Sequence, residues 1–410
     1  MASRIYILGG YQTDFSANWT REGRTIFEMM AEATLGAMNA ASVEAADIEV
    51  AHVGNFAGEL YCEQGHLGGM FTAIDPHFVG LPTMRHEAAC ASGSMAALSA
   101  MADIEAGRYD LACVVGVEVM RSVPGDTATR YLGTAAWTGR EAGTARYVWP
   151  HLFNRLAEEY GERYGIEHAH LGRIAEINIA NGRRNPNAQT RNWRFTPDSF
   201  GEDDEANPVI DGMLRRNDCG QVTDGAATVF LASEKAARRH AERIGVTLDD
   251  LPFIKGWGHR TGPMRLQDKL EASRDAALIL PHVKATVDDA LGRAGLEDVF
   301  ALDGLEIHDC FSATEYMAID HFGITRPGES WKAIEEGWIE PGGRIPINPS
   351  GGLIGLGHPV GASGVRMLLD CFKQVTDTAG DYQVPGARNF ATLNVGGSAT
   401  TTASFVVGRD

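Results

Sequence analysis

The stretch "GASGVRMLLDCF" at residues 361–372 opens with small residues that begin a predicted helix, and it parallels "CASGSMAALSAM" at residues 90–101. Both stretches carry Ala-Ser-Gly at the helix start. Two further elements precede residues 361–372 in the same order as in the first half: a helix predicted at 281–295 and the strand "LDGLEIHDCF" (302–311). This strand matches "IEVAHVGNF" (48–56). Chance similarity of small-residue turns is the alternative, but three matches in one order favour an internal duplication.

The first half reads as alternating strands and helices. Strands are predicted at 4–9, 48–56 and 110–120, and helices at 25–38 and 86–107. This alternation predicts an α/β layer architecture with right-handed crossovers.

Residues 121–215 lack long apolar strands and are rich in Arg, Asn, Tyr and Trp. Two amphipathic stretches, 151–165 and 171–185, predict a helical insertion. The predicted units are the first part of the N-terminal half (1–120), a helical loop domain (121–215), the completion of the N-terminal half (216–250) and a C-terminal half (251–410).

Charge and cysteine content exclude several classes of function. The net charge of −18 argues against a nucleic-acid partner, because such proteins carry a basic surface. No segment has the length of a membrane span, and the first residues lack the apolar core of a signal peptide. The six cysteines show no CxxC pair and no zinc-like spacing, so we expect free thiols in the cytoplasm and no metal site.

Cys90 is the first candidate catalytic residue. It precedes small residues at a predicted helix start, where the helix dipole lowers a thiol pKa and small neighbours admit a substrate carbonyl. A packed core cysteine is the alternative interpretation. His358 lies among glycines in "NPSGGLIGLGHPVGASG" (348–364), where the backbone can approach a ligand and the imidazole can act as base to a thiol.

The stretch "EIHDCFSATE" (306–315) ends a predicted buried strand with His308, Asp309 and Cys310 side by side. A hydrophobic core needs none of these groups, so a second reactive stretch elsewhere in the chain is expected to explain them.

The motifs "CASG", "HDCF", "GHPVGASG" and "NVGGSA", in this order, resemble those of the thiolase family over essentially the whole chain. The resemblance implies two α/β halves in a five-layered αβαβα arrangement, with a helical loop domain inserted in the first half. The HDCF motif is similar to the sterol-carrier-protein-type branch, because ordinary thiolases carry Asn-Glu-Ala-Phe there. A second catalytic cysteine of ordinary thiolases is replaced here by Asn394.

The resemblance also implies the roles of the site residues. Cys90 is the acyl-accepting nucleophile, and His358 takes its proton. His308 holds the thioester oxygen of the incoming acyl-CoA, and Cys310 is the acid/base at the α-carbon in place of the thiol lost at Asn394. Backbone N–H groups of Cys90 and Gly396 form an oxyanion hole. Asp309 and Asn394 are expected to orient these groups.

The insertion is expected to bind coenzyme A. Its stretch "NGRRNPNAQTRNWRF" (181–195) gathers arginines around Trp193, which suit phosphates and an adenine ring, although a solvated charged face is an equally weighted alternative. The candidate coenzyme-binding residues are His151, Arg183, Arg184, Trp193, Arg215 and Arg216. Cys219 is a candidate for the substrate tunnel.

The resemblance therefore implies an acyltransferase of lipid metabolism that acts on CoA thioesters, by thiolysis of 3-ketoacyl-CoA or condensation of acyl-CoAs, as a homodimer or homotetramer without a covalently bound cofactor. Two alternatives remain: an acyltransferase or aldolase subunit beside a small zinc-binding partner, and a non-catalytic lipid-binding scaffold. Retention of Cys90, Cys310 and His358 argues against a purely aldol role. A scaffold would tolerate the loss of Cys90 and His358, yet both are present.

Overall fold

A nine-stranded mixed sheet organises the chain, which the computed structural model describes from residue 4 to residue 410. The strand order is β3-β2-β4-β7-β1-β8-β11-β10-β9. Its strands are β1 (Ile5–Gln12), β2 (Val50–Gly54), β3 (Thr83–His86), β4 (Leu111–Glu118), β7 (Gly225–Ala232), β8 (Phe253–Thr261), β9 (Gly304–Ile307), β10 (Asn389–Gly396) and β11 (Thr401–Gly408). A small separate sheet pairs β5 (Val209–Asp211) with β6 (Leu214–Arg215).

Helices cover both faces of the sheet and fill the space between its two halves. They are α1 (Ile26–Ala41), α2 (Gly58–Cys62), α3 (Phe71–Ile74), α4 (Ser92–Glu105), α5 (Gly125–Leu132), α6 (Val148–Tyr164), α7 (His168–Gly182), α8 (Glu234–Ile244), α9 (Leu266–Ala272), α10 (Pro281–Ala294), α11 (Ser312–Phe322), α12 (Ser330–Glu335) and α13 (Val360–Val375). None of the helices within residues 4–410 combines the length and hydropathy needed to cross a bilayer.

The two halves repeat one topology, which confirms the predicted duplication. The order β2-β4-β7-β1 in the first half matches β9-β10-β11-β8 in the second. Each half begins with a parallel pair and continues with two antiparallel pairs. The helices correspond too, with α1 and α10 after the first strand and α4 and α13 before the parallel partner strand. The halves join through β1 and β8, where Ile5 pairs with Ile254 and Tyr6 with Phe253.

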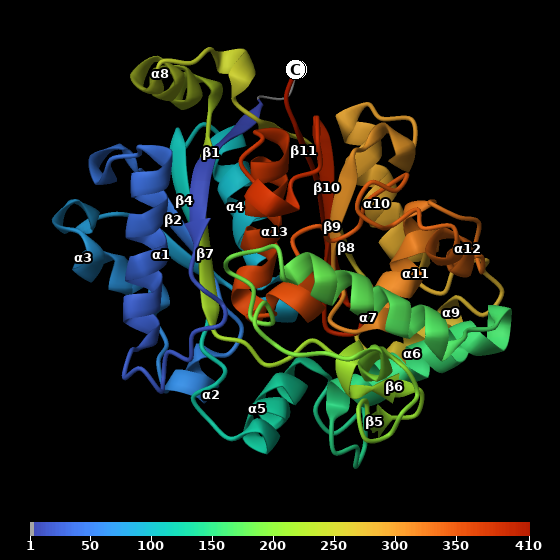
Figure 1. The fold of residues 1–410 in the computed structure, drawn as a ribbon. Coiled ribbons are helices and arrows are strands. Elements are labelled where there is room, and N and C mark those ends of the chain that lie inside the picture. The colour runs from blue at the N-terminus through green and yellow to red at the C-terminus, as the bar shows by residue number, and fades with distance from the viewer. Residues whose placement is uncertain (1–3) are drawn as a thin grey trace.

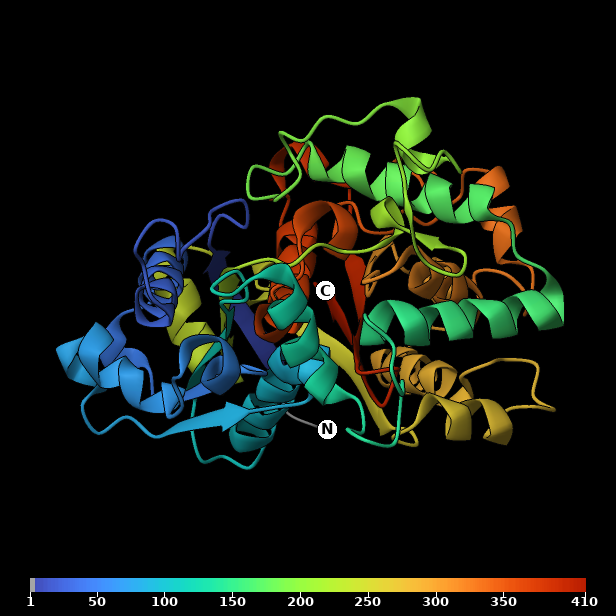
Figure 2. The same ribbon diagram turned by 90° about the horizontal axis from the view of Figure 1, so that it is seen from below.

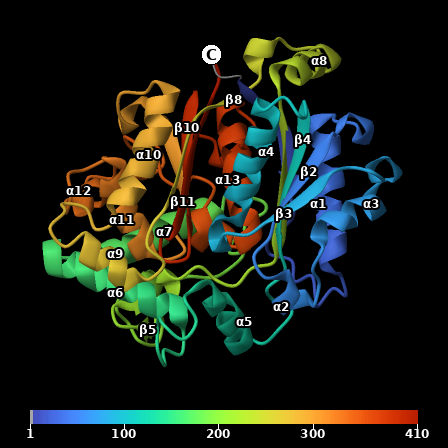
Figure 3. The same cartoon turned by 180° about the vertical axis from the view of Figure 1, so that it is seen from behind.

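Five layers follow one another across Figure 1. Helix α1 covers the outer face of the first half, and α10 and α11 cover the outer side of the second. Helices α4 and α13 lie between the halves (Figures 1 and 3), where α13 contacts strands of both halves and α4 contacts α13 and strands of the first half. Strands β4 and β7 are buried at every position, as expected for strands with a helical layer on each face.

Glycines allow the two central helices to approach closely. A Cβ atom on Gly93 of α4 would lie 2.8 Å from the Gly361 carbonyl oxygen, and one on Gly364 of α13 would lie 2.5 Å from the backbone nitrogen of Ser94. Such contacts leave no room for a side chain. The glycines that end the two Ala-Ser-Gly motifs therefore lie at the same helix–helix contact.

The helical insertion leaves the first half between β4 and β7 but packs mainly on the second half. Helices α6 and α7 contact α9, α11 and α12, as the view from below shows (Figure 2). Its predicted boundaries at 121–215 stay a prediction; β4 ends at Glu118 and β7 begins at Gly225.

We expect Gly364→Ala to lower the free energy of unfolding by about 1–3 kcal/mol, because the new methyl group overpacks the contact between α4 and α13. Gly292→Ala in α10 is the matched control, since a Cβ atom there meets no other group within 4 Å and alanine favours the helix by about 0.5–1 kcal/mol. Denaturant unfolding of both variants measures the difference. A Gly364→Ala protein as stable as the control would contradict the packing argument.

Candidate active site

The two central helices deliver Cys90 and His358 to one place. Cys90 lies in the 3-10 turn Ala89–Ala91 that leads into α4, and His358 lies two residues before α13. Cys90 Sγ and one ring nitrogen each of His308 and His358 lie within 4.8 Å of one another. The imidazole rings of His308 and His358 meet edge to face, with centroids 5.1 Å apart. Residues far apart in the sequence thus form one cluster.

Hydrogen bonds determine the tautomer of His358. Its Nδ1 lies 2.7 Å from Ser363 Oγ, and that hydroxyl donates its hydrogen to the Pro359 carbonyl oxygen at 3.1 Å. Ser363 Oγ therefore accepts from Nδ1–H, which leaves Nε2 unprotonated. Nε2 is buried without a hydrogen-bond partner among the described residues, so it is the free base of the cluster.

His308 has the opposite arrangement. Its Nδ1 faces two donors, the Asn394 side-chain nitrogen at 3.2 Å and the Val395 backbone N–H at 3.4 Å. A ring nitrogen that accepts hydrogen bonds carries no proton, so the neutral ring carries its hydrogen on Nε2. Asn394 also donates to the Cys90 carbonyl oxygen at 3.1 Å and accepts from Ser94 Oγ at 2.8 Å. The side chain that replaces the second cysteine thus orients His308.

The cluster lines an inner cavity of about 80 Å³. Cys90, His308, Cys310 and His358 all contribute to its wall. Cys310 Sγ is buried and lies 3.8 Å from Thr314 Oγ1. Four of the five residues predicted to be catalytic are therefore brought together, on an otherwise largely apolar surface.

The fifth predicted residue, Gly396, is not part of this wall. Its neighbour Gly397 lines the cavity, and the backbone N–H groups of Gly397 and Cys90 act on the Cys90 thiol. Gly396 instead pairs with Thr401 as β10 passes into β11. The motif "NVGGSA" locates the turn, but the sequence does not indicate which of its two glycines faces the thiol.

Burial keeps the resting site uncharged. Desolvation, with a smaller effect of the Glu118 charge, raises the pKa of Cys90 to about 12. Desolvation, with a smaller effect of Arg366, lowers the pKa of His358 to about 3, and burial beside His358 holds the pKa of His308 well below its usual range. The expectation that the helix start lowers the Cys90 pKa is wrong for the empty site, because desolvation outweighs the backbone N–H groups.

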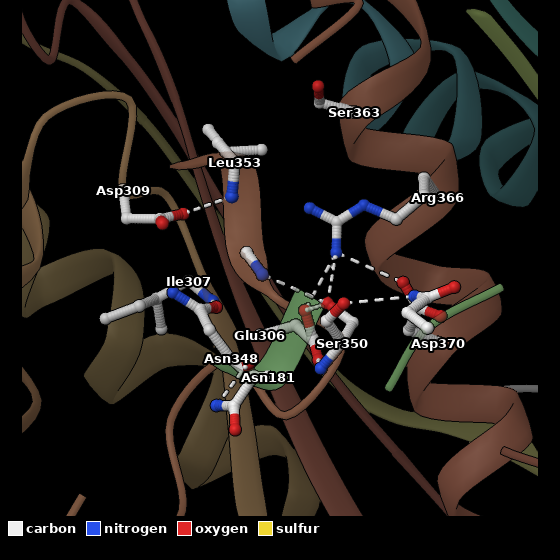
Figure 4. Close-up of polar contacts among 12 residues, drawn as sticks. Asn181, Glu306, Ile307, Asp309, Asn348, Ser350, Leu353, Ser363, Arg366 and Asp370 are labelled. Atoms are coloured by element: carbon white, nitrogen blue, oxygen red, sulfur yellow. Dashed lines mark hydrogen bonds and ion pairs between the residues drawn. The ribbon is translucent and has the colours of Figure 1, made fainter. Parts of the chain in front are cut away.

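Asp309 connects the loop that carries His308 and Cys310 to the turn before His358 through hydrogen bonds. Its carboxylate accepts the backbone N–H of Leu353 at 2.5 Å (Figure 4). It also accepts the backbone N–H of Ile354 at 3.1 Å and the Asn178 side-chain N–H at 2.8 Å. Gly352 has a φ of 61°, and a Cβ atom there would lie 2.5 Å from Asp309 Oδ2. The geometry therefore supports the expected orienting role of Asp309.

A buried ion pair supports the same region from α13. Arg366, fully buried, donates to Glu306 at 2.8 Å, to Ser350 at 3.0 Å and to Asp370 at 3.1 Å (Figure 4). Glu306 belongs to β9, which leads directly to His308. The guanidinium thus ties α13 to the strand that carries the HDCF motif. Sequence reasoning missed Arg366, although a charge within an apolar helix face was a usable signal.

Glu118 is a second residue that sequence reasoning missed. It ends β4, is fully buried, and accepts the backbone N–H groups of Phe56 at 2.8 Å, Ala57 at 3.1 Å and Gly361 at 3.1 Å. Burial raises its pKa to about 7. Glu118 joins β4 to the first turn of α13 and so helps to place His358 relative to Cys90.

An outer chamber of about 370 Å³ adjoins the inner cavity and shares Leu132, Trp149, Gly220 and Phe311 with its wall. Arg216 and Cys219 also line it.

The other candidate coenzyme residues near the outer chamber are engaged elsewhere. His151 follows Pro150 of the chamber wall and lies 3.5 Å from Asp211. Arg215 points away, toward Asp204 at 2.8 Å.

The arginine cluster of the insertion lies elsewhere. Arg183 and Arg184 line a separate groove of about 500 Å³ that shares no residue with the two cavities. The length of α7 explains the separation. Its first residue, His168, bonds to Asp218 beside the outer chamber, whereas Arg183 follows its last residue, about 20 Å away at 1.5 Å per residue. Trp193 is 39% exposed and stacks on Phe195 instead of facing a cavity.

Comparison with known proteins identifies related families. A model described as "Thiolase, N-terminal domain" matches residues 5–197, and one described as "Thiolase C-terminal domain-like" matches residues 265–409. An acetyl-CoA acetyltransferase of Methanothermobacter thermautotrophicus is 31% identical over 99% of each chain. Sterol carrier protein 2 of Homo sapiens is 26% identical over 99% of this chain and 72% of the relative.

Solved structures share the fold. A structure described as "Ltp2-ChsH2(DUF35) aldolase" superposes with a TM-score of 0.77 at 20% identity, covering 99% of this chain and 98% of that one. Human mitochondrial 3-ketoacyl-CoA thiolase in complex with CoA superposes with a TM-score of 0.69 at 15% identity, covering 100% and 98%. At these identities the likeness concerns the fold alone.

We expect alkylation of Cys90 in the unliganded protein to accelerate by about tenfold per pH unit through the neutral range, because only the thiolate reacts and the Cys90 pKa is about 12. Peptide mass analysis after iodoacetamide treatment at a series of pH values measures the rate, and Cys90→Ser reports the background from the other thiols. A rate that is constant through the neutral range would contradict a protonated resting thiol.

Proposed function

We propose, on the premise that this chain belongs to the thiolase family, that it transfers acyl groups between coenzyme A thioesters through a covalent thioester on Cys90. The protein is a thiolase-type acyltransferase. The single observation that supports the proposed mechanism best is that Cys90 Sγ and a ring nitrogen of His358 meet in one cavity, while His358 Nε2 has no hydrogen-bond partner among the described residues.

The acylation step follows from the His358 tautomer, whose Nε2 is unprotonated. His358 Nε2 removes the Cys90 proton as the sulfur attacks the thioester carbonyl, because neither group is charged beforehand. The N–H groups of Cys90 and Gly397 stabilise the oxyanion of the tetrahedral intermediate. The carbon–sulfur bond to coenzyme A then breaks. The leaving thiolate takes the Cys310 proton, and His358 keeps the proton that it removed from Cys90.

The second step uses the opposite wall of the cavity. In condensation, the Cys310 thiolate left by the acylation step removes a proton from the α-carbon of a second acyl-CoA, whose thioester oxygen accepts the His308 Nε2–H. The resulting enolate attacks the acyl group on Cys90 and releases the Cys90 thiolate, which recovers its proton from His358. Thiolysis is the reverse. Asn394 supports this assignment, because its hydrogen bond fixes the His308 tautomer that presents Nε2–H.

Coenzyme A is proposed to enter through the outer chamber, with Arg216 of the chamber wall as a phosphate partner. Arg183, Arg184 and Trp193 are the original candidates for this role, but their groove is separate from the chamber.

Cytoplasmic location, a role in lipid metabolism and a dimeric or tetrameric state remain part of the proposal. A small zinc-binding partner remains a secondary one, favoured only by the fold shared with the aldolase structure.

Replacing Cys310 by Ala is expected to separate the two half-reactions. Acetyl-CoA should still add one acetyl group to the Cys90 peptide, because in the variant the leaving CoA thiolate can take its proton from His358. Condensation should fall by about 10²–10⁴-fold, the usual contribution of a positioned acid/base. Rapid-quench measurement of CoA release beside steady-state condensation tests both steps. Cys90→Ser should abolish the label, and a label on any other residue would overturn the proposed nucleophile.

Charge removal at the two arginine sites distinguishes the routes for coenzyme A. We expect Arg216→Ala to raise KM for acetyl-CoA more than for the acetyl-pantetheine thioester, which lacks the nucleotide phosphates. Arg183→Ala with Arg184→Ala should leave both values near those of the wild type, because that groove is separate from the cavity. If the Arg183/Arg184 double variant raised KM for acetyl-CoA and Arg216→Ala did not, the phosphate site would lie in the groove instead.

A further inference from the structure

Two aromatic rings close the inner cavity. Phe153 of α6 and Phe311, which follows Cys310, stack with ring centroids 4.7 Å apart, and both line the cavity. Phe153 is 3% exposed. Its ring comes from the insertion, whereas the catalytic groups come from the two halves, so this part of the wall is independent of the catalytic loops.

Behind Phe153 lies a rear pocket with an apolar lining. Phe153 lines both spaces, and the side chains that line only the rear pocket include Leu156, Leu280, Val283 and Met317. The free volume of the rear pocket is only about 10 Å³, which is the threshold for a single water molecule. The Phe153 ring therefore separates the inner cavity from the rear pocket, which is almost completely filled by its own side chains.

The size of the inner cavity limits the group that Cys90 can carry. An apolar cavity of about 150 Å³ accommodates benzene, so about 80 Å³ holds roughly half of that carbon content. The other connection leads to the outer chamber, which the coenzyme arm fills under the proposed function. An acyl chain on Cys90 can lengthen only by moving the Phe153 ring.

We propose that Phe153 determines acyl-chain length and restricts the enzyme to short acyl groups of about two to four carbons. This inference rests on the proposed function and names its substrate class. Phe153 makes no side-chain hydrogen bond, so its ring acts through volume alone. Removal of the ring joins the inner cavity to the rear pocket and opens a path between α6, α10 and α11 for a longer chain.

The test compares acylation rates of Cys90 with acetyl-, butyryl-, hexanoyl- and octanoyl-CoA, measured by intact mass. The wild-type rate with hexanoyl-CoA should lie at least about 10²-fold below that with acetyl-CoA, since poor fit of even one methylene costs about 10–200-fold. Phe153→Ala should raise the hexanoyl-to-acetyl ratio by about 10²-fold, and Phe153→Leu by less.

Leu156→Ala is the matched control. It also truncates a buried apolar side chain of α6 and enlarges the rear pocket, but it leaves the Phe153 partition intact, so its ratio should equal that of the wild type. The double variant Phe153→Ala with Leu156→Ala should also acylate Cys90 with octanoyl-CoA. Thermal unfolding of each variant confirms folding, and Phe153→Leu serves as the test if Phe153→Ala does not fold.

Two results would overturn the inference alone: rapid loading of octanoyl-CoA on the wild type, or an unchanged chain-length ratio in a folded Phe153 variant that still loads acetyl groups. Absence of any acyl group on wild-type Cys90, acetyl included, would overturn the proposed function and this inference together.

Discussion

The close contact between α4 and α13 is the constraint on which the rest of the structure depends. The missing side chains of Gly93 and Gly364 let the backbones approach until a Cβ atom would lie 2.5–2.8 Å from backbone of the opposite helix. Because Cys90 and His358 precede these helices by two residues, the same contact sets the distance between nucleophile and base. The same contact therefore contributes to core packing and to the geometry of the site, so a substitution there affects both.

Burial favours the uncharged forms of the catalytic pair. It holds the Cys90 pKa high and the His358 pKa low, so the cavity favours a thiol and an imidazole over an ion pair. Proton transfer is then coupled to attack on the carbonyl, where the developing charge meets fixed backbone N–H groups. The charged groups lie behind this neutral surface, with Arg366 bound to Glu306 and Asp370 (Figure 4). A buried ion pair of this kind fixes geometry more than it adds stability.

The insertion completes the cavity from outside the duplicated core. It departs from the first half, yet α6 and α7 pack on the second (Figure 2). Trp149 and Phe153 of α6 line the cavity together with Cys90. The duplicated halves supply the chemistry and the insertion supplies the shape of the space around it. Under the proposal for Phe153, the residue that limits acyl-chain length lies on α6, whereas Cys90, Cys310 and His358 lie on the two halves.

The sequence alone determined the α/β class, the duplication and the four side chains that meet in the cavity, because helical periodicity, repeated Ala-Ser-Gly motifs and reactive residues in glycine-rich loops are local signals. Tertiary structure decided what depends on distance and burial. Desolvation reversed the pKa shift expected at Cys90, and Gly397 instead of Gly396 faces the thiol because the turn after β10 determines which amide points inward. The length of α7 carries Arg183 away from the cavity. Adjacent residues such as Gly396 and Gly397 look equivalent in a sequence, although only one of them faces the cavity. Side-chain and amide orientation, and the exclusion of solvent, are set only when distant segments pack together.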